Sequence, residues 1–216
     1  MNDLSLTQEY LLCTLNEKGK YSSMDVEKGV CLVAGSILEL LMEGVLKLEK
    51  KKISTVAPLP AGKKYLSPVY DRIRQKEPVK VEAVMEYFSF SFSDKNLYAL
   101  LGDIGDTLAE AGCAEKGEGG MLRKTSVYVP DAKAKDAVIQ KIRAELLEDG
   151  ELSEDIIALT VLLQKSGDLC RYFSAYEKKD LKQRLKSIKK SSENQFVKQM
   201  VEYIENLFAL VIIVAT

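Results

Sequence analysis

The 216-residue sequence contains no histidine and no tryptophan. Without histidine, the chain can form no Ser-His-Asp triad, no Cys-His pair and no histidine-ligated metal site. It has no GxxxxGK[ST] phosphate loop, and Gly117-Glu-Gly119-Gly120 lacks the GxGxxG spacing and follows a predicted helix where that motif follows a strand. We therefore expect a protein that is not an enzyme and that uses no cofactor.

Long apolar runs are also missing. The longest, Leu207 to Thr216, has 10 residues, whereas a membrane-spanning helix needs about 20. The first residues, MNDLSLTQEY, lack the basic segment and apolar stretch of a signal peptide. These features predict a cytoplasmic protein whose apolar end is buried in its core.

Charge of one sign does not dominate the chain. Its 31 basic residues nearly cancel its 32 acidic ones, for a net charge of −1, so any anion-binding surface must be local. The four cysteines, Cys13, Cys31, Cys113 and Cys170, form no CxxC pair and have no regular spacing. We expect them to be buried, reduced thiols.

Helical periodicity covers most of the sequence. Ser5 and Gln8 have the spacing of a capping box before the first helix. The segment Met24–Glu43 is apolar nearly all round, as in a buried helix. The periodicity predicts further helices over the ranges 67–74, 78–88, 94–112, 131–146, 154–164, 169–176, 178–190 and from 193.

Two of these helices end at a glycine that leads into a hairpin. Gly44 precedes apolar strands on either side of the lysine tip Lys50–Lys52. Gly112 precedes a second hairpin, whose turn we place at Gly117, Gly119 and Gly120. The sequence therefore predicts a mainly α protein: one domain, residues 1–216, with a helical core and two short β-hairpins.

The segment Lys178–Lys190 is the most informative charged stretch. As a helix it gathers its lysines within about 120° of arc and leaves Leu181, Leu185 and Ile188 on a separate face. Such a basic amphipathic helix can bind anionic lipid or phosphate, or it can be an ordinary surface helix packed on the core. The candidate lipid- or anion-binding residues are Lys178, Lys179, Lys182, Lys186, Lys189 and Lys190.

Acidic residues share one face of the predicted helix before the second hairpin. Asp103, Asp106 and Glu110 have the spacing for a magnesium site, but no further ligands occur at suitable spacing elsewhere. We interpret them as a solvated helix face, and we expect no metal site.

The stretch from Ser5 to Leu147 resembles the Golgi phosphoprotein 3 family in the order and spacing of its motifs. The matching segments are Leu6-Thr-Gln-Glu-Tyr-Leu-Leu12, Gly19-Lys-Tyr21, Ile37-Leu-Glu-Leu40, Gly44-Val-Leu-Lys-Leu48, Pro60-Ala-Gly62, Glu77-Pro78 and Leu108-Ala-Glu-Ala-Gly112. The C-terminal third is similar mainly in its helix pattern.

The resemblance implies a helical fold with a protruding hairpin. It also implies a peripheral membrane protein that binds phosphatidylinositol 4-phosphate at the cytosolic face of the Golgi, with self-association through the hairpin near Lys116–Val129. Because a long polar N-terminal extension is missing, a bacterial relative is expected.

The lipid site is where the sequence departs from the family. Members hold the headgroup with a tryptophan and an arginine near the start of the long helix, and with an arginine pair on the helix before the second hairpin. At the first place this chain has Met24, Lys28 and Val33, and at the second it carries Asp103 and Asp106. Carboxylates repel phosphate, so none of the family's binding residues can be carried over.

Three functional hypotheses remain. The first is a peripheral membrane or phosphoinositide-binding module. The second is a winged-helix-like nucleic-acid binder that uses the lysine tip as a wing, which the apolar preceding helix and the net charge disfavour. The third is an oligomerising structural protein without a lipid ligand, in which the hairpins are the contact edges.

Overall fold

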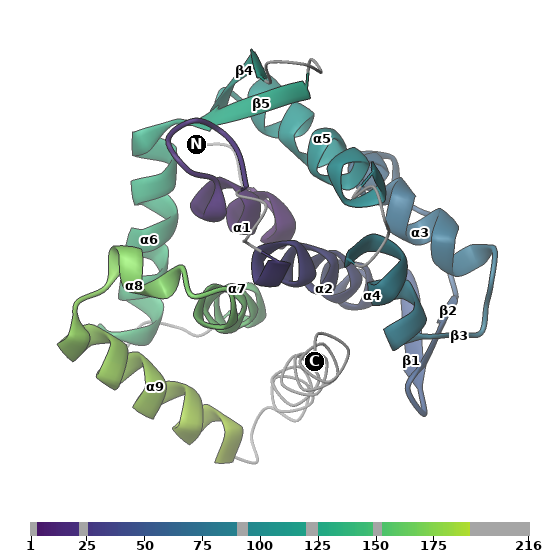
Figure 1. Cartoon of the computed structure of the whole chain (residues 1–216). Coiled ribbons are helices and arrows are strands. Elements are labelled where there is room, and N and C mark those ends of the chain that lie inside the picture. Colours follow the sequence, from purple (N-terminus) through teal and green to yellow (C-terminus); the bar gives the residue numbers. More distant parts are fainter. Residues whose placement is uncertain (1–3, 22–25, 90–94, 120–124, 149–152, 191–216) are drawn as a thin grey trace.

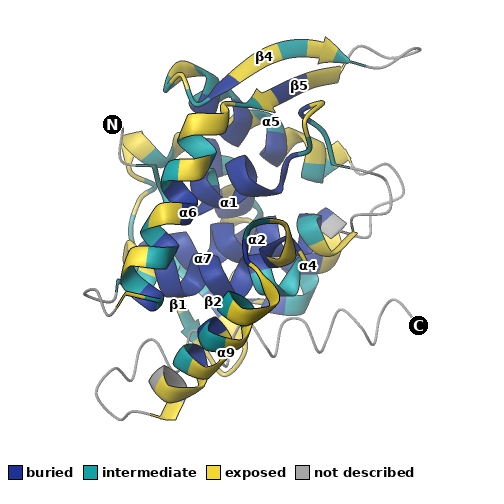
Figure 2. Ribbon diagram, turned by 90° about the vertical axis from the view of Figure 1, so that its left-hand side faces the viewer, coloured by how far each residue is buried: buried dark blue, intermediate teal, exposed yellow. Residues whose placement is uncertain are grey.

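The computed structural model describes residues 4–21, 26–89, 95–119, 125–148 and 153–190. Three helices, α1 (Leu6–Thr14), α2 (Val26–Met42) and α7 (Glu154–Lys165), lie at its centre. Every residue of α2 from Gly29 to Leu40 is buried (Figure 2). The expectation of a buried long helix is confirmed.

Small residues allow these central helices to approach closely. A methyl group added at Gly35 of α2 would lie 3.2 Å from Leu162 of α7 and 3.5 Å from Thr7 of α1. The space at Gly35 is therefore filled by side chains from both neighbours, which fixes the packing of the three helices.

The remaining helices surround this centre (Figure 1). The helix before the second hairpin, α5, lies near the top of that view, and α9 lies at the lower left. The outer elements are η1 (Ala61–Leu66), α3 (Ser67–Arg74), α4 (Val81–Ser89), α5 (Lys95–Glu110), α6 (Ala132–Leu146), α8 (Leu169–Tyr172) and α9 (Ala175–Lys190). The described part of the chain is thus mainly helical, as predicted; the helix predicted from 193 lies outside the described residues.

The two glycine-terminated helices end in the same way. Gly44 and Gly112 have φ values of +67° and +70°, which are costly for a residue with a side chain. At each, the glycine N–H donates to the carbonyl three residues back, and the following N–H donates to the carbonyl five residues back, at 2.8–3.1 Å. This is the Schellman arrangement, and at each glycine it turns the chain from helix into strand.

Two antiparallel sheets follow these caps. The first joins β1 (Leu46–Glu49), β2 (Lys52–Thr55) and the two-residue strand β3 (Val79–Lys80), which periodicity did not predict. The second joins β4 (Ala114–Gly119) to β5 (Thr125–Pro130). Gly117 and Gly119 lie within β4, so their assignment to the turn was wrong; Gly120 lies outside the described residues.

The motif Ile37–Leu40 has a structural explanation in Glu39. This carboxylate is 4% exposed and joins three elements, because it accepts hydrogen bonds from α1 and from η1. The donors are the backbone N–H of Thr7 (2.9 Å), its hydroxyl (2.6 Å), the Tyr65 hydroxyl (2.5 Å) and the Lys63 ammonium (2.9 Å). A buried carboxylate with this many donors is tolerated as an ion, so we assign Glu39 a role in folding.

Candidate functional site

Helix α9 begins at a capping box that sequence inspection missed. The Ser174 N–H donates to Glu177 at 2.8 Å, and the Glu177 N–H donates to the Ser174 hydroxyl at 3.2 Å. The Ser174 backbone and hydroxyl, together with Arg143, lower the pKa of Glu177 to about 2. The first turn of α9 is thereby tied to α6, since the Arg143 Nε lies 3.0 Å from the Glu177 carboxylate.

The helix is amphipathic in the way its sequence predicts. Leu181 and Leu185 are buried, and Figure 2 shows α9 at the lower side of the molecule with buried and exposed residues alternating along it. Four of the predicted lysines are exposed, namely Lys179, Lys182, Lys186 and Lys190, and Lys178 is half-buried. The side chain of Lys189, like that of Ile188, lies outside the described residues.

A groove of about 670 Å³ runs between α9 and the turn that connects α7 to α8. Four of the predicted lysines line it on the α9 side: Lys178, Lys179, Lys182 and Lys186. The other lining residues include Gln164, Leu169 and Cys170. The groove combines ammonium groups with apolar side chains, which suits a ligand that carries both an anionic group and an apolar part.

The far wall of this groove could not be read from the sequence. Leu169 and Cys170 belong to the four-residue helix α8, and only the packing of that helix brings them beside α9. The helix predicted over 169–176 was too long, because α8 ends at Tyr172 and the backbone at Phe173 is extended.

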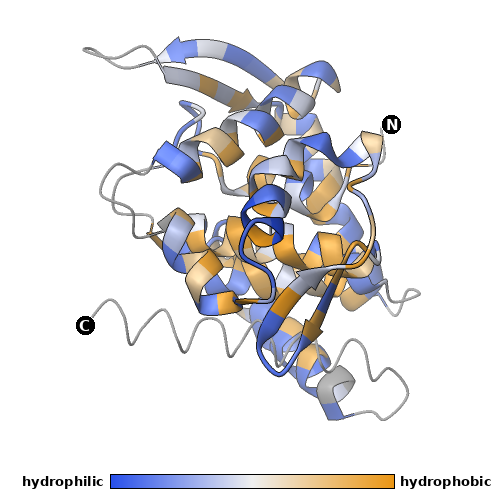
Figure 3. Ribbon diagram, turned by 90° about the vertical axis from the view of Figure 1, so that its right-hand side faces the viewer, coloured by the Kyte–Doolittle hydropathy of each residue, from blue (hydrophilic) through white to orange (hydrophobic). Residues whose placement is uncertain are grey.

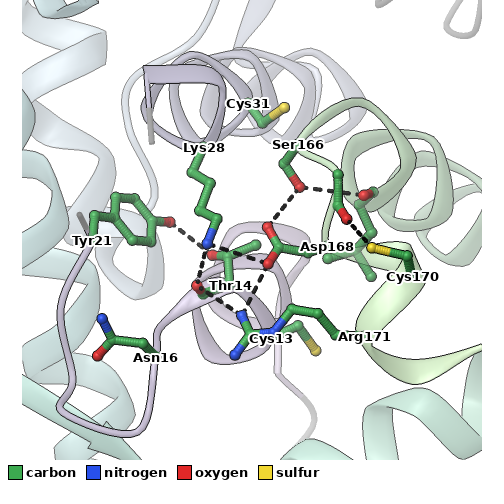
Figure 4. A network of polar contacts seen from close by, with 12 residues as sticks. Cys13, Thr14, Asn16, Tyr21, Lys28, Cys31, Ser166, Asp168, Cys170 and Arg171 are labelled. Carbon is green, nitrogen blue, oxygen red and sulfur yellow. Dashed lines mark hydrogen bonds and ion pairs between the residues drawn. The ribbon is translucent and has the colours of Figure 1, made fainter. Parts of the chain in front are cut away.

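The start of α2, where the resemblance places part of the headgroup site, is occupied by the protein's own polar groups (Figure 4). Asp168, only 2% exposed, lies 3.3 Å from the Lys28 ammonium and 2.9 Å from the Arg171 guanidinium. It also accepts a hydrogen bond from Ser166 at 3.0 Å. Lys28 therefore shares the Asp168 carboxylate with Arg171, and its ammonium is engaged inside the protein.

The second part of that region, on α5, is acidic. Asp106 accepts hydrogen bonds from the Tyr128 hydroxyl at 2.6 Å and lies 2.5 Å from the Lys116 ammonium. Although partial burial raises the pKa of Asp106, these two bonds hold it below its usual value. Asp106 thus fastens the second hairpin to α5, and its side chain stays 46% exposed, in keeping with the solvated face predicted for it.

Asp103 keeps the exposed position predicted for this face. Partial burial and the neighbouring Asp106 charge raise its pKa. Within the described ranges, no group of three or more potential ligands could hold a metal ion.

The cysteine prediction is confirmed in part. All four thiols are free, and Cys13 and Cys31 are buried, which raises the pKa of both. Cys113 is half-buried and Cys170 is exposed, so the expectation that all four are buried was wrong. Cys170 belongs to α8 and lines the groove beside α9.

The winged-helix hypothesis gains no support from the fold. A DNA-recognition helix must present one face to a DNA groove, but α2, which precedes the lysine-tipped hairpin, is buried from Gly29 to Leu40.

None of the described helices is both long and apolar enough to cross a membrane.

Comparison with known proteins identifies a family for this chain. The profile of the family described as Golgi phosphoprotein 3 (GPP34) matches residues 6–206. No curated protein matches the chain.

Proposed function

The chain belongs to the Golgi phosphoprotein 3 family, and from this premise we propose that it is a non-enzymatic, peripheral membrane module that binds anionic lipid through the lysine face of α9. The family is a phosphoinositide-binding one without enzymatic activity. The observation that carries the proposal is the groove beside α9, with its four lysines and its leucine side chains.

Charge, and not headgroup stereochemistry, governs the proposed binding. Lysine acts as a point charge and does not form the bidentate contacts by which arginine recognises phosphate. At the start of α2, Lys28 is held by Asp168 at 3.3 Å, and α5 presents Asp103 and Asp106. We therefore expect phosphatidylserine and phosphatidylinositol 4-phosphate to support binding in proportion to their charge.

Vesicle sedimentation at low salt tests this proposal. Phosphatidylcholine vesicles should bind the protein weakly, and the same vesicles with phosphatidylserine or phosphatidylinositol 4-phosphate should bind it well. Each lysine near an anionic surface contributes about 1 kcal/mol, so Lys182→Glu with Lys186→Glu should weaken binding about 30-fold or more.

The matched control is Lys18→Glu with Lys133→Glu. Both lysines are exposed and belong to the loop after α1 and the first turn of α6, away from α9 (Figure 1). This control should retain most of the binding. Absence of binding to every anionic vesicle would refute the proposal. If both double variants lost the same amount of binding, α9 would not be the lipid-binding element.

A further inference from the structure

The tip of the first hairpin is built from lysines in an unfavourable turn. Lys50 and Lys51 connect β1 to β2, and both have positive φ, 48° and 67°. Two-residue hairpin turns with this backbone strongly favour Asn-Gly. A lysine pair in such a turn costs free energy that Asn-Gly would avoid, so the charges at this position call for an explanation beyond folding.

The charges around the tip add to that cost. Lys52 on β2 lies directly opposite Lys80 on β3, and like charges in such a pair destabilise a sheet. On its other side Lys52 is paired with Glu49, whose carboxylate lies 3.4 Å from the Lys47 ammonium. On the described strand residues 46–49, 52–55 and 79–80, Glu49 is the one carboxylate. The same strands carry Lys47, Lys52 and Lys80, and the turn adds Lys50 and Lys51, so positive charge is in excess at this end of the hairpin.

The cluster is held in place by the body of the protein. The carbonyl of Lys51 accepts a hydrogen bond of 3.2 Å from the N–H of Val81, the first residue of α4. At the base of the hairpin, the Glu77 carboxylate accepts hydrogen bonds from the N–H and hydroxyl of Thr55, at 2.7 and 2.6 Å. The lysine tip is therefore presented at a fixed position, which lowers the entropic cost of binding.

The tip of the first hairpin and helix α9 lie at the same end of the molecule. In Figures 1, 2 and 3, which are related by rotation about the vertical axis, both elements are at the lower end and β4–β5 is at the upper end. The hydrophilic tip is at the bottom of the hairpin in Figure 3. An anionic ligand that reaches both clusters must therefore extend across this end.

We propose that the lysine tip Lys50–Lys52, with Lys80, is a second contact with the anionic lipid surface, so that this end of the molecule faces the membrane and β4–β5 points away from it. This inference rests on the proposed function, because it takes α9 as the first contact. A bilayer surface meets two separate lysine clusters at once, whereas a compact phosphate ligand meets only one. Lysines also favour a diffuse lipid charge over stereospecific recognition.

The test is the double variant Lys50→Asn with Lys51→Gly, measured with phosphatidylcholine vesicles that contain phosphatidylserine. It replaces the lysine pair by the preferred turn, so the melting temperature should rise, by about 2–4 °C. Vesicle binding should fall about 30-fold, because two lysine contacts are lost. Loss of binding together with a gain of stability cannot arise from misfolding.

Two further measurements complete the test. Lys18→Asn with Lys133→Asn removes the same charge elsewhere and should leave most of the binding intact. In the wild-type protein, vesicles should slow hydrogen exchange of the backbone amides of residues 50–52 and 80 and leave exchange in β4 unchanged.

The outcomes separate this inference from the proposed function. If the wild-type chain binds and the α9 variant does not, but the tip variant binds as the wild type does, only the inference is refuted. If vesicles protect β4 and not the tip, the proposed orientation is refuted. If the tip variant loses affinity for duplex DNA and keeps its affinity for vesicles, the tip is a nucleic-acid contact and the inference is wrong. If no anionic vesicle binds the wild type, both fail.

Discussion

Replacement of Glu39 by glutamine should be one of the most damaging single-atom changes in the protein. The carboxylate is 4% exposed and accepts four hydrogen bonds, from Thr7, Tyr65 and Lys63. A glutamine fits the same space, but its amide nitrogen cannot accept hydrogen bonds, and it leaves donors without a partner. Removing one member of a buried, hydrogen-bonded charge pair costs about 3–5 kcal/mol.

The structure places Glu39→Gln near the lower end of that range. Lys63 keeps a second partner, because its ammonium also lies 2.9 Å from the Glu43 carboxylate. It is also 19% exposed, so water replaces part of the lost interaction. We expect a loss of about 3 kcal/mol in the free energy of unfolding, and a drop of about 6–12 °C in melting temperature.

The dependence of this loss on pH identifies its cause. Burial raises the pKa of Glu39, but the hydrogen bonds from Thr7 and Tyr65 and the charge of Lys63 outweigh it and hold the pKa below its usual value. The ionised carboxylate therefore stabilises the fold above the unfolded-state pKa, about 4.3. That contribution is lost as the pH falls through the lower, folded-state pKa.

Urea unfolding, followed by circular dichroism at several pH values, measures both effects. The difference between the wild type and Glu39→Gln should be full at neutral pH and should shrink below about pH 4. Glu43→Gln is the control, because Glu43 is 41% exposed and should cost less than about 1 kcal/mol. A loss below about 1 kcal/mol in Glu39→Gln, or a difference independent of pH, would refute the reasoning.

Two other predictions concern packing and accessibility. Gly105→Ala places a methyl carbon 2.5 Å from the Tyr128 ring and should destabilise the protein by about 1–3 kcal/mol. Gly102→Ala, whose methyl carbon would lie 3.9 Å from the Tyr128 hydroxyl, should be neutral or stabilising by up to about 1 kcal/mol. Thermal unfolding of the two variants measures both effects. A thiol reagent should label Cys170 rapidly and leave Cys13 and Cys31 unlabelled in the folded protein; mass spectrometry of the labelled peptides would contradict this if a buried cysteine reacted at the rate of Cys170.

Local sequence signals were good predictors of the helices and their ends. The capping spacing of Ser5 and Gln8 corresponds to a hydrogen bond of 2.9 Å from the Ser5 N–H to the Gln8 side chain. Asp131 caps α6 by accepting a hydrogen bond of 2.8 Å from Ala134. These interactions join residues a few positions apart, so their spacing in the sequence is enough to reveal them.

Contacts between distant residues were not predictable in this way. Strand β3 has two residues, and it is a strand only because Val79 and Lys80 pair with β2. The placement of Gly117 and Gly119 in β4 was missed for the same reason, since β5 supplies their partners. Glycine favours a turn locally, and pairing with a neighbouring strand can override that preference.

The sequence by itself determined the absence of histidine chemistry, the helical class, the two glycine caps and the lysine face of α9, because each depends on residue type or on short-range spacing. Only the tertiary structure decided what surrounds each charge. It paired Lys28 with Asp168, 140 positions away in the chain, and it left the lysines of α9 beside a groove. The energy of a charge depends on its neighbours in space and on its burial, and these are properties of the folded chain.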